Sequence, residues 1–271
     1  MNLPILLTAS VSTHGMKGAL FSDNERETMY LATLEFYLNM LPENRQLVFA
    51  ENSGWNLHNF KTKLIGHVGK NATRIEYISI NPSICDQNRG KGYNEILMIN
   101  EAIVNSKAIQ NAGAFLKVTG RYPIYNLVYF LTAAEAYFNK GGKYYGDIKD
   151  HHVYDILFFN SQKKWNGHAA YTVLFAVTLD FYRQYFHDSY QHCNDYTNNW
   201  IENVWFSILK PFREKKDYSV SLRFSREPIC GGLQGSSVQT FVFSQSNNSI
   251  KARILRFIGN SFRLLTPWFW F

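Results

Sequence analysis

The chain has 271 residues, of which 46% are hydrophobic and 16% aromatic, a composition that excludes wholesale disorder and suffices for a sizeable core. The net charge of +7 indicates an anionic partner, and nucleic acid, anionic lipid and a phosphorylated substrate all satisfy that requirement. The three cysteines are widely separated, which excludes a disulfide framework and a Cys-x-x-Cys metal knuckle, so we expect a reducing compartment.

The amino-terminal segment, residues 1–8, lacks both a positively charged region and a long apolar core. It is therefore typical of a first strand rather than of a signal peptide. The apolar segment Tyr171–Phe181 is too short to cross a bilayer as a helix. These features predict a cytoplasmic protein.

Short apolar runs alternate with helical patterns in the first part of the chain. The expected N-cap of the first helix is Ser22 or Asp23, because acidic residues follow in the first turn. The expected order is strand 3–9, a loop at 13–18 able to meet a ligand, helix 23–40, strand 47–50, helix 56–70, strand 75–80, a helix following the 88–95 loop, and strand 115–119. This alternation predicts a layered α/β fold with parallel strands joined by crossover helices.

The second part of the chain gives a less regular pattern. Leu127–Phe138 fits either a helix or a strand. Apolar and aromatic residues recur at helical spacing over 165–186 and again over 198–209, so we predict a helix in each range, followed by a strand at 219–224.

The segment 115–122 has the composition of a strand that ends at a ligand site. Ligands of α/β proteins gather at the carboxyl ends of the strands. Gly120 would let the backbone approach a ligand, while Arg121 offers a planar cationic fork and Lys117 a point charge. The alternative is a strand followed by an ordinary polar turn.

Two further loops have phosphate-binding character. Arg89 and Lys91 precede a helix N-terminus, which favours an anion, although the spacing is not that of a Walker motif and an ordinary loop-to-helix turn has the same pattern. The loop 228–237 is rich in glycine and serine, and such loops bind phosphates or merely turn.

Acidic and histidine residues supply candidates for a base or a metal ligand. His151 and His152 are adjacent and lack a third ligand at a recognised spacing, so a solvated loop is expected there rather than a metal site. Glu202 is embedded in an apolar helical face, where desolvation could tune it as a base, or it could simply be exposed or paired.

The carboxyl-terminal residues differ in character from the rest of the chain. Lysine and arginine alternate with apolar residues over 250–265, and Thr-Pro-Trp-Phe-Trp-Phe follows. A basic amphipathic helix ending in tryptophans suits a membrane surface, whereas the alternative is a terminal helix docked with its aromatic residues buried. We predict a domain at 1–246 and a membrane-surface tail at 247–271, which contacts the membrane through 250–271.

Several of these motifs occur in order between residues 3 and 240: Thr8-Ala-Ser10, Arg26 with Tyr30, Glu51-Asn-Ser53, Gly90-Lys-Gly-Tyr-Asn-Glu95, Lys117-Val-Thr-Gly-Arg-Tyr122, Glu202 and Gly231-Gly-Leu-Gln-Gly-Ser-Ser237. Together they resemble bacterial glycosyltransferases of lipopolysaccharide, O-antigen and capsule biosynthesis. The resemblance implies a GT-A-like, Rossmann-like fold with a central, mostly parallel sheet flanked by helices, and here a C-terminal amphipathic helix. The string from Lys117 to Tyr122 is its most specific part.

The resemblance also implies an activity and a site. It implies transfer of a hexose from a nucleotide-sugar donor, expected to be UDP-linked, to a lipid-linked or oligosaccharide acceptor at the inner face of the plasma membrane. The implied donor-binding residues are Thr8, Ser10, Arg26, Glu51, Asn52, Ser53, Lys91, Gly92, Lys117, Thr119, Gly120, Arg121, Tyr122, Gly232 and Ser236. The candidate catalytic carboxylates are Glu202, Asp155 and Glu95.

One departure from the family concerns metal. Typical members hold a divalent cation through Asp-x-Asp after the fourth strand, and Thr119-Gly-Arg121 stands in the comparable place here. No cofactor and no metal ligand are therefore assigned. A divalent metal stays open as an alternative to stabilisation of the departing diphosphate by Arg121 with Lys91 or Lys117. Two alternatives are another nucleotide- or phosphate-dependent transferase and a non-catalytic protein that binds anionic lipid. Nucleic acid is not expected, because the cations are scattered among loops.

Overall fold

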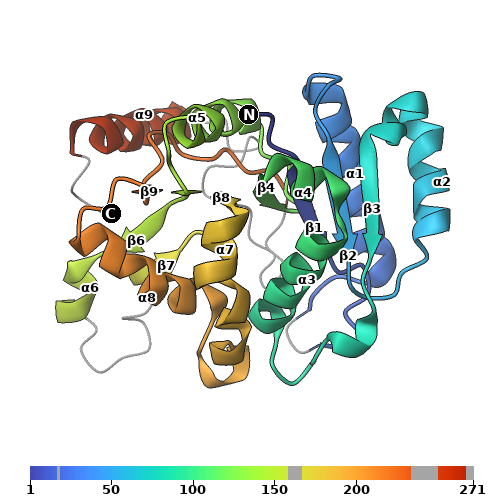
Figure 1. Cartoon of the computed structure of the whole chain (residues 1–271), viewed down its shortest axis with the longest axis horizontal. Coiled ribbons are helices and arrows are strands. Elements are labelled where there is room, and N and C mark those ends of the chain that lie inside the picture. The colour runs from blue at the N-terminus through green and yellow to red at the C-terminus, as the bar shows by residue number, and fades with distance from the viewer. Residues whose placement is uncertain (17–18, 158–166, 233–249, 267–271) are drawn as a thin grey trace.

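The computed structural model describes residues 1–16, 19–157, 167–232 and 250–266 (Figure 1). Its centre is a seven-stranded sheet in the order β3-β2-β1-β4-β8-β5-β9. The strands are β1 (Ile5–Ala9), β2 (Leu47–Glu51), β3 (Ile75–Ser79), β4 (Ala114–Thr119), β5 (Tyr144–Tyr145), β8 (Leu174–Thr178) and β9 (Val220–Ser221). The first four in chain order are mutually parallel, whereas β8 runs antiparallel to both β4 and β5.

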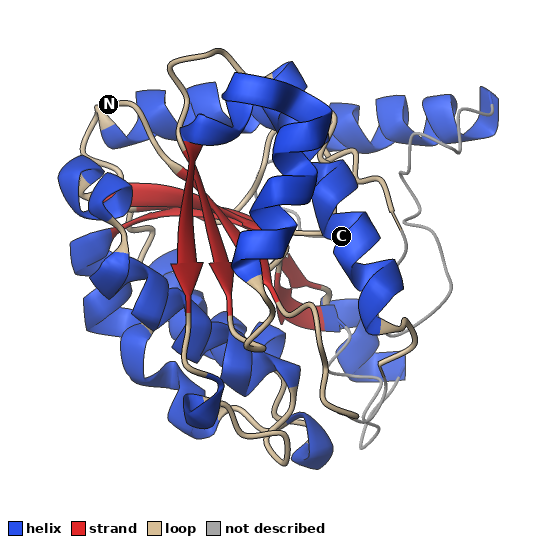
Figure 2. Ribbon diagram, turned by 90° about the vertical axis from the view of Figure 1, so that its right-hand side faces the viewer, coloured by secondary structure: helices blue, strands red, loops and turns tan. Residues whose placement is uncertain are grey.

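Helices cover both faces of this sheet (Figure 2). One face packs against α1 (Asp23–Met40), α2 (Leu57–Val68) and α5 (Leu127–Phe138). The other packs against α3 (Lys91–Asn105), α4 (Lys107–Ala112), α7 (Leu179–Tyr185) and α8 (Ile201–Glu214). The predicted architecture, a mostly parallel sheet flanked by helices and followed by a C-terminal helix, is confirmed.

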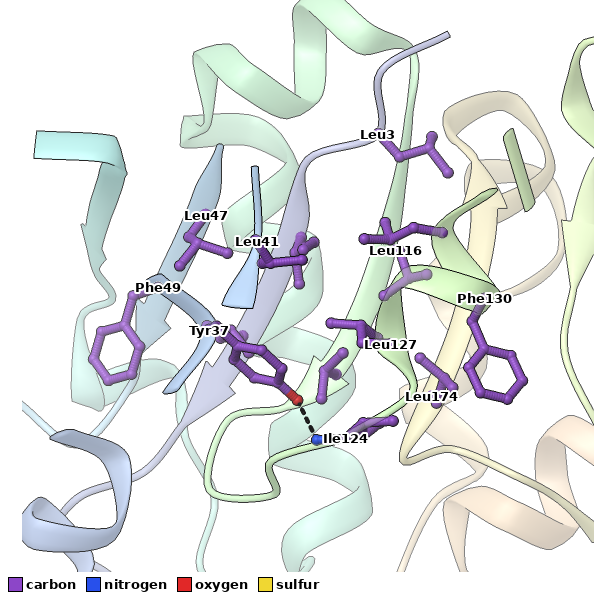
Figure 3. Packing of buried hydrophobic residues seen from close by; sticks show 14 of the residues in the cluster. Leu3, Tyr37, Leu41, Leu47, Phe49, Leu116, Ile124, Leu127, Phe130 and Leu174 are labelled. Carbon is purple, nitrogen blue, oxygen red and sulfur yellow. Dashed lines mark hydrogen bonds between the residues drawn. The ribbon is translucent and has the colours of Figure 1, made fainter. Parts of the chain in front are cut away.

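Strand residues alternate between the two cores, as a pleated strand buried on both sides requires. In β4, Leu116 and Val118 join the core under α1 and α5, while Phe115 joins the core under α3. Within the first core, the hydroxyl of Tyr37 accepts from the backbone N–H of Ile124 at 2.9 Å (Figure 3) and donates to the carbonyl of Tyr122 at 2.8 Å. Tyr37 therefore fixes the course of the chain just after β4.

The helix start at Ser22 is confirmed. The Ser22 hydroxyl accepts from the backbone N–H of Glu25, and the Glu25 carboxylate accepts from the backbone N–H of Ser22 at 2.8 Å. Two orphan N–H groups of the first turn are thus satisfied by a capping box. Leu127–Phe138, which fitted a helix or a strand, is helix α5.

The predicted helix over 165–186 is wrong for much of its length. Its described part begins with β7 (His168–Ala170), which pairs with β6 (Ile148–Asp150), and continues with β8 before helix α7 starts at Leu179. The reason is that β8 lies in the middle of the sheet, so its residues are apolar on both faces and show no strand periodicity. The predicted strand 219–224 is also shorter, at Val220–Ser221.

The C-terminal helix α9 (Ile250–Leu265) docks by its polar edge. Arg263 donates from Nη1 to Asp147 at 2.9 Å and from Nε to Glu227 at 2.7 Å, and Asn260 accepts from the Glu227 backbone N–H at 3.0 Å. Burial raises the pKa of Asp147 to about 6, and the charge of Arg263 opposes that shift.

The opposite edge of α9 is apolar and open, with Phe257 74% exposed. Ile250, Ile254, Ile258, Phe262, Leu264 and Leu265 are also exposed. Within the described part of the tail, the aromatic residues Phe257 and Phe262 are exposed rather than buried. The terminal tryptophans and the boundary expected near 246 lie outside the described residues. Among the helices that the structure describes, none is both long and apolar enough to cross a membrane.

Candidate functional site

A pocket of about 190 Å³ lies where β1, β2 and β4 end. The carboxyl edge of parallel strands is the usual place for a ligand in this architecture. The residues of the predicted donor site that line it are Thr8, Ser10, Arg26, Asn52, Ser53, Lys91, Thr119 and Arg121. The structure therefore brings together side chains that are spread over more than a hundred positions of the sequence.

One end of the pocket is cationic. Burial lowers the pKa of Lys91, and the positive charges of Arg121 and Arg26 lower it further. Arg121 donates from Nη2 to the Tyr122 hydroxyl at 3.0 Å and stacks 5.0 Å from the centre of that ring, while its buried Nε has no partner in the described residues. Like charges held this close are relieved by a bound anion.

The other end of the pocket is neutral. Ser10 donates its hydroxyl proton to Oδ1 of Asn52 at 2.5 Å, and the Ser53 hydroxyl accepts from the backbone N–H of Ser12 at 2.9 Å. The His14 ring contacts the Ser53 carbonyl through Nε2 at 2.8 Å, in a left-handed backbone conformation with φ of 46°. Hydroxyl and amide groups thus face a ligand here, and the Arg26 guanidinium is held beside them by the Ser10 carbonyl.

The Glu51 carboxylate holds the loops that form the neutral end of the pocket. Its buried carboxylate accepts from the backbone N–H groups of Val11 at 3.0 Å, Ser53 at 2.9 Å and Trp55 at 3.1 Å, and also from the Ser53 hydroxyl. These bonds tie the loop after β1 to the loop after β2. Glu51 was predicted near the nucleotide, and the structure gives it protein partners that position Ser53.

Lys117 is also turned inward. It is 0% exposed, and its ammonium contacts Glu95 at 2.6 Å, the Thr172 carbonyl at 2.7 Å and the Thr119 hydroxyl at 3.0 Å. Thr8 donates to the same Glu95 carboxylate at 3.1 Å. Lys117 therefore holds Glu95 at the pocket wall, and a direct contact of Lys117 with a ligand stays a prediction.

The N-terminus of α3 holds an anion that belongs to the protein itself. Asp195 accepts from the backbone N–H of Lys91 at 2.6 Å and of Gly92 at 3.4 Å. Gly90 has φ of +88°, and a Cβ there would lie 2.6 Å from Asp195. Arg89 donates to the carbonyl of Cys193 at 2.9 Å. The anion at this helix end is thus Asp195, and of the two cations Arg89 and Lys91 it is Lys91 that lines the pocket.

Three other predicted donor residues lie around the end of β4. Gly120 donates to the Thr8 carbonyl at 2.9 Å, and a Cβ on Gly120 would lie 2.7 Å from that oxygen. The close approach that needs glycine is therefore to strand β1. Tyr122 is buried against Arg121, and Gly232 lies so near that its Cβ would be 3.2 Å from the Arg121 carbonyl. Ser236 lies outside the described residues.

The three candidate catalytic carboxylates are in different places. Glu95 lines the pocket. Glu202 accepts from Thr172 at 3.4 Å, and burial raises its pKa, as do the charges of Glu95 and Asp195. Asp155 lies on α6 (His152–Leu157), which Figure 1 shows well away from α3, and contacts Nε2 of His168 at 2.9 Å. The structure does not bring Asp155 to the pocket.

The residues at the end of β4 do not fit a divalent cation. Arg121 is itself positively charged, and the described residues contain no group of three or more His, Cys, Asp or Glu side chains able to hold a metal ion. His168 does meet two acids, since its Nδ1 also contacts Asp150 at 2.8 Å, but both its ring nitrogens are occupied by those carboxylates.

Some lining residues were not assigned from the sequence. His14 belongs to the loop expected to meet a ligand, yet no spacing singled it out. Cys85 lines the pocket and donates to the Asn52 carbonyl at 3.6 Å, and burial raises its pKa. Asp195 had no local signal, because it meets Lys91 across a separation of 104 residues.

The sequence matches no protein-family model and no curated protein. Among solved structures, it is similar to mouse xyloside xylosyltransferase 1, with 9% identity and a TM-score of 0.44. This match covers 83% of this chain and 86% of that chain. It is also similar to the galactosyltransferase LgtC, with 10% identity and a TM-score of 0.45, and the match covers 83% of this chain and 74% of that chain. It is similar as well to the bifunctional glycosyltransferase WbbM, with 9% identity and a TM-score of 0.48, and this match covers 96% of this chain and 44% of that chain. Identities this low carry no residue roles from one chain to another.

Proposed function

We propose that the chain is a glycosyltransferase that moves a hexose from a UDP-linked donor to a lipid-linked or oligosaccharide acceptor in bacterial surface polysaccharide synthesis. The observation that carries this proposal is a pocket in which Lys91 and Arg121 lie on one side and Asn52 lies on the other, with Arg26 and Ser10 between them. A nucleoside diphosphate has the matching shape, with a neutral hydrogen-bonding head and a doubly charged tail. The ordered motifs of the sequence support the same activity.

The reaction would use the cationic end of the pocket. As the acceptor oxygen bonds to the anomeric carbon, the bond from that carbon to the phosphate oxygen breaks and the diphosphate leaves with the electron pair. Arg121 and Lys91 are fixed cations beside the position where that charge develops, which is the role a metal plays in other transferases.

The acceptor must also lose a proton. Two carboxylates stand near the pocket: Glu95, which lines it, and Glu202, whose raised pKa suits a general base. Asp155 is the weakest candidate because it pairs with His168, which lies on β7 of the separate two-stranded sheet β6-β7.

A thermal-shift screen tests this function. We expect UDP and UDP-sugars to raise the melting temperature without added metal, because a ligand that binds only the folded state stabilises it. Transfer of labelled sugar to an acceptor then identifies the reaction. Magnesium-dependent release of pyrophosphate without sugar transfer would favour a nucleotidyltransferase and contradict the proposal.

For the carboxyl-terminal helix we propose contact with the cytoplasmic face of an anionic membrane. The support is the way α9 contacts the rest of the protein. A polar residue, Arg263, makes the contact, while the apolar residues Phe257 and Ile254 are exposed next to the exposed Arg253. Exposed apolar side chains next to cations suit the interface of anionic lipid headgroups and acyl chains.

Phe257→Glu tests the membrane contact. We expect it to weaken binding to phosphatidylglycerol vesicles about tenfold, because burial of one phenylalanine is worth roughly 1.5–3 kcal/mol. The matched control is Tyr218→Glu, which changes an aromatic residue that is 87% exposed on the body of the protein. A point substitution is preferable to deletion of 247–271, which would leave Asp147 without Arg263. Equal binding by both variants would contradict the proposal.

A further inference from the structure

The side chain of Asn52 is built into the neutral end of the pocket with half of its amide uncommitted. Asn52 is only 5% exposed and lines the pocket. Its backbone N–H donates to the Ala9 carbonyl at 3.2 Å, and its carbonyl accepts from Cys85 at 3.6 Å. Its Oδ1 accepts from Ser10 at 2.5 Å, whereas no hydrogen bond joins its Nδ2 to any of the described residues. This amide donor is therefore available to an acceptor on a ligand.

The orientation of the Asn52 amide is fixed by Ser10, which is itself held by neighbouring residues. The Ser10 backbone N–H donates to the Tyr30 hydroxyl at 3.1 Å, and Arg26 Nε donates to the Ser10 carbonyl at 2.9 Å. Ser10 is therefore held in place, and its hydroxyl in turn holds Oδ1 of Asn52. With Oδ1 held by Ser10, the group that Asn52 offers the pocket is the Nδ2 donor.

The separation of Asn52 from Arg121 matches the length of a nucleoside. Asn52 follows β2 and Arg121 follows β4, and these strands are separated by β1 alone. Two strand spacings amount to about 10 Å. When the diphosphate of a pyrimidine nucleotide lies at Arg121, the group that extends farthest in the other direction is the substituent on C4 of the base.

We propose that Asn52 is a specificity-determining residue that selects a keto group at C4 of a pyrimidine base, and so selects uridine over cytidine nucleotides; this rests on the function proposed above. Uracil carries an oxygen acceptor at C4, which accepts from Nδ2. Cytosine carries an amino group there, which places two donors against each other and leaves both unsatisfied.

Asn52→Asp tests the inference because it replaces the donor with an acceptor while keeping the contact to Ser10. Binding of UDP, CDP and inorganic pyrophosphate to the full chain is measured by calorimetry. We expect the wild type to prefer UDP over CDP by about tenfold, since one hydrogen bond is worth roughly 1 kcal/mol or more. The Asp variant should prefer CDP over UDP. The affinity for pyrophosphate, which has no base, should differ little between the variant and the wild type.

Ser10→Ala is the second variant, for the case in which an added carboxylate beside Glu51 disturbs folding. It frees the Asn52 amide to rotate, so the UDP preference should shrink without reversing. If Asn52→Asp and Ser10→Ala both keep the wild-type ratio of UDP to CDP affinity, the inference is wrong and the proposed function stands. If the wild type binds pyrophosphate but neither nucleotide, the proposed function fails as well.

Discussion

Replacing Arg121 with alanine is expected to lower the affinity for UDP by roughly 10- to 100-fold while the protein stays folded, since a charge-assisted hydrogen bond is worth about 1.5–3 kcal/mol. Within the described residues the guanidinium has Nε buried without a hydrogen-bond partner, and its Nη2 donates to the Tyr122 hydroxyl. Binding energy is therefore available to a phosphate, and little stability is lost with the side chain. The measurement is calorimetric titration with UDP and with pyrophosphate.

Two variants sharpen this test. Arg121→Lys should recover only part of the affinity, because an ammonium is a point charge and cannot donate two parallel hydrogen bonds to a phosphate. Arg183→Ala removes the same net charge from an exposed position on α7 and is the matched control. Affinity for both ligands that is unchanged in Arg121→Ala would show that the diphosphate does not bind at the end of β4.

The sequence was most informative for the first part of the fold, in which strands and helices alternate. The alternation of apolar runs and helical stripes predicted β1 to β4 with their helices, because each crossover needs a strand, a helix and a parallel strand. Arg121 was predicted from its place after a strand, whereas Ser10 and Asn52 were implied by the family resemblance, and all three line the pocket. Parallel strands bring their carboxyl ends to one edge, so residues after each strand must meet.

The sequence was least informative where the partner comes from far along the chain. Lys117 and Arg121 look equally available as cations, but the pleat turns Lys117 under α3 to Glu95 and leaves Arg121 beyond the strand. Asp195 occupies the α3 N-terminus through a contact that no local spacing predicts. Strand β8 was missed because burial on both faces removes the alternation that distinguishes a strand from a helix.

Replacing Lys117 with methionine is expected to destabilise the fold by about 3–5 kcal/mol, the usual result of removing one partner of a buried ion pair. The Lys117 side chain is 1% exposed and that of Glu95 is 21% exposed, so the remaining carboxylate would be poorly solvated. The Thr172 carbonyl would also lose its donor. Urea unfolding measures the loss, and Lys140→Met, at an exposed lysine, is the control.

The double variant Lys117→Met/Glu95→Gln separates the cost of the lone charge from that of the lost packing. Methionine fills much of the volume of the lysine stem, and glutamine keeps an acceptor for the Thr8 hydroxyl without a charge. We therefore expect the double variant to be more stable than Lys117→Met alone, because the unpaired carboxylate accounts for most of the penalty. A loss below about 1 kcal/mol in Lys117→Met would mean that water or a rearranged side chain satisfies Glu95, and Lys117 would then not be the residue that fixes Glu95 at the pocket wall.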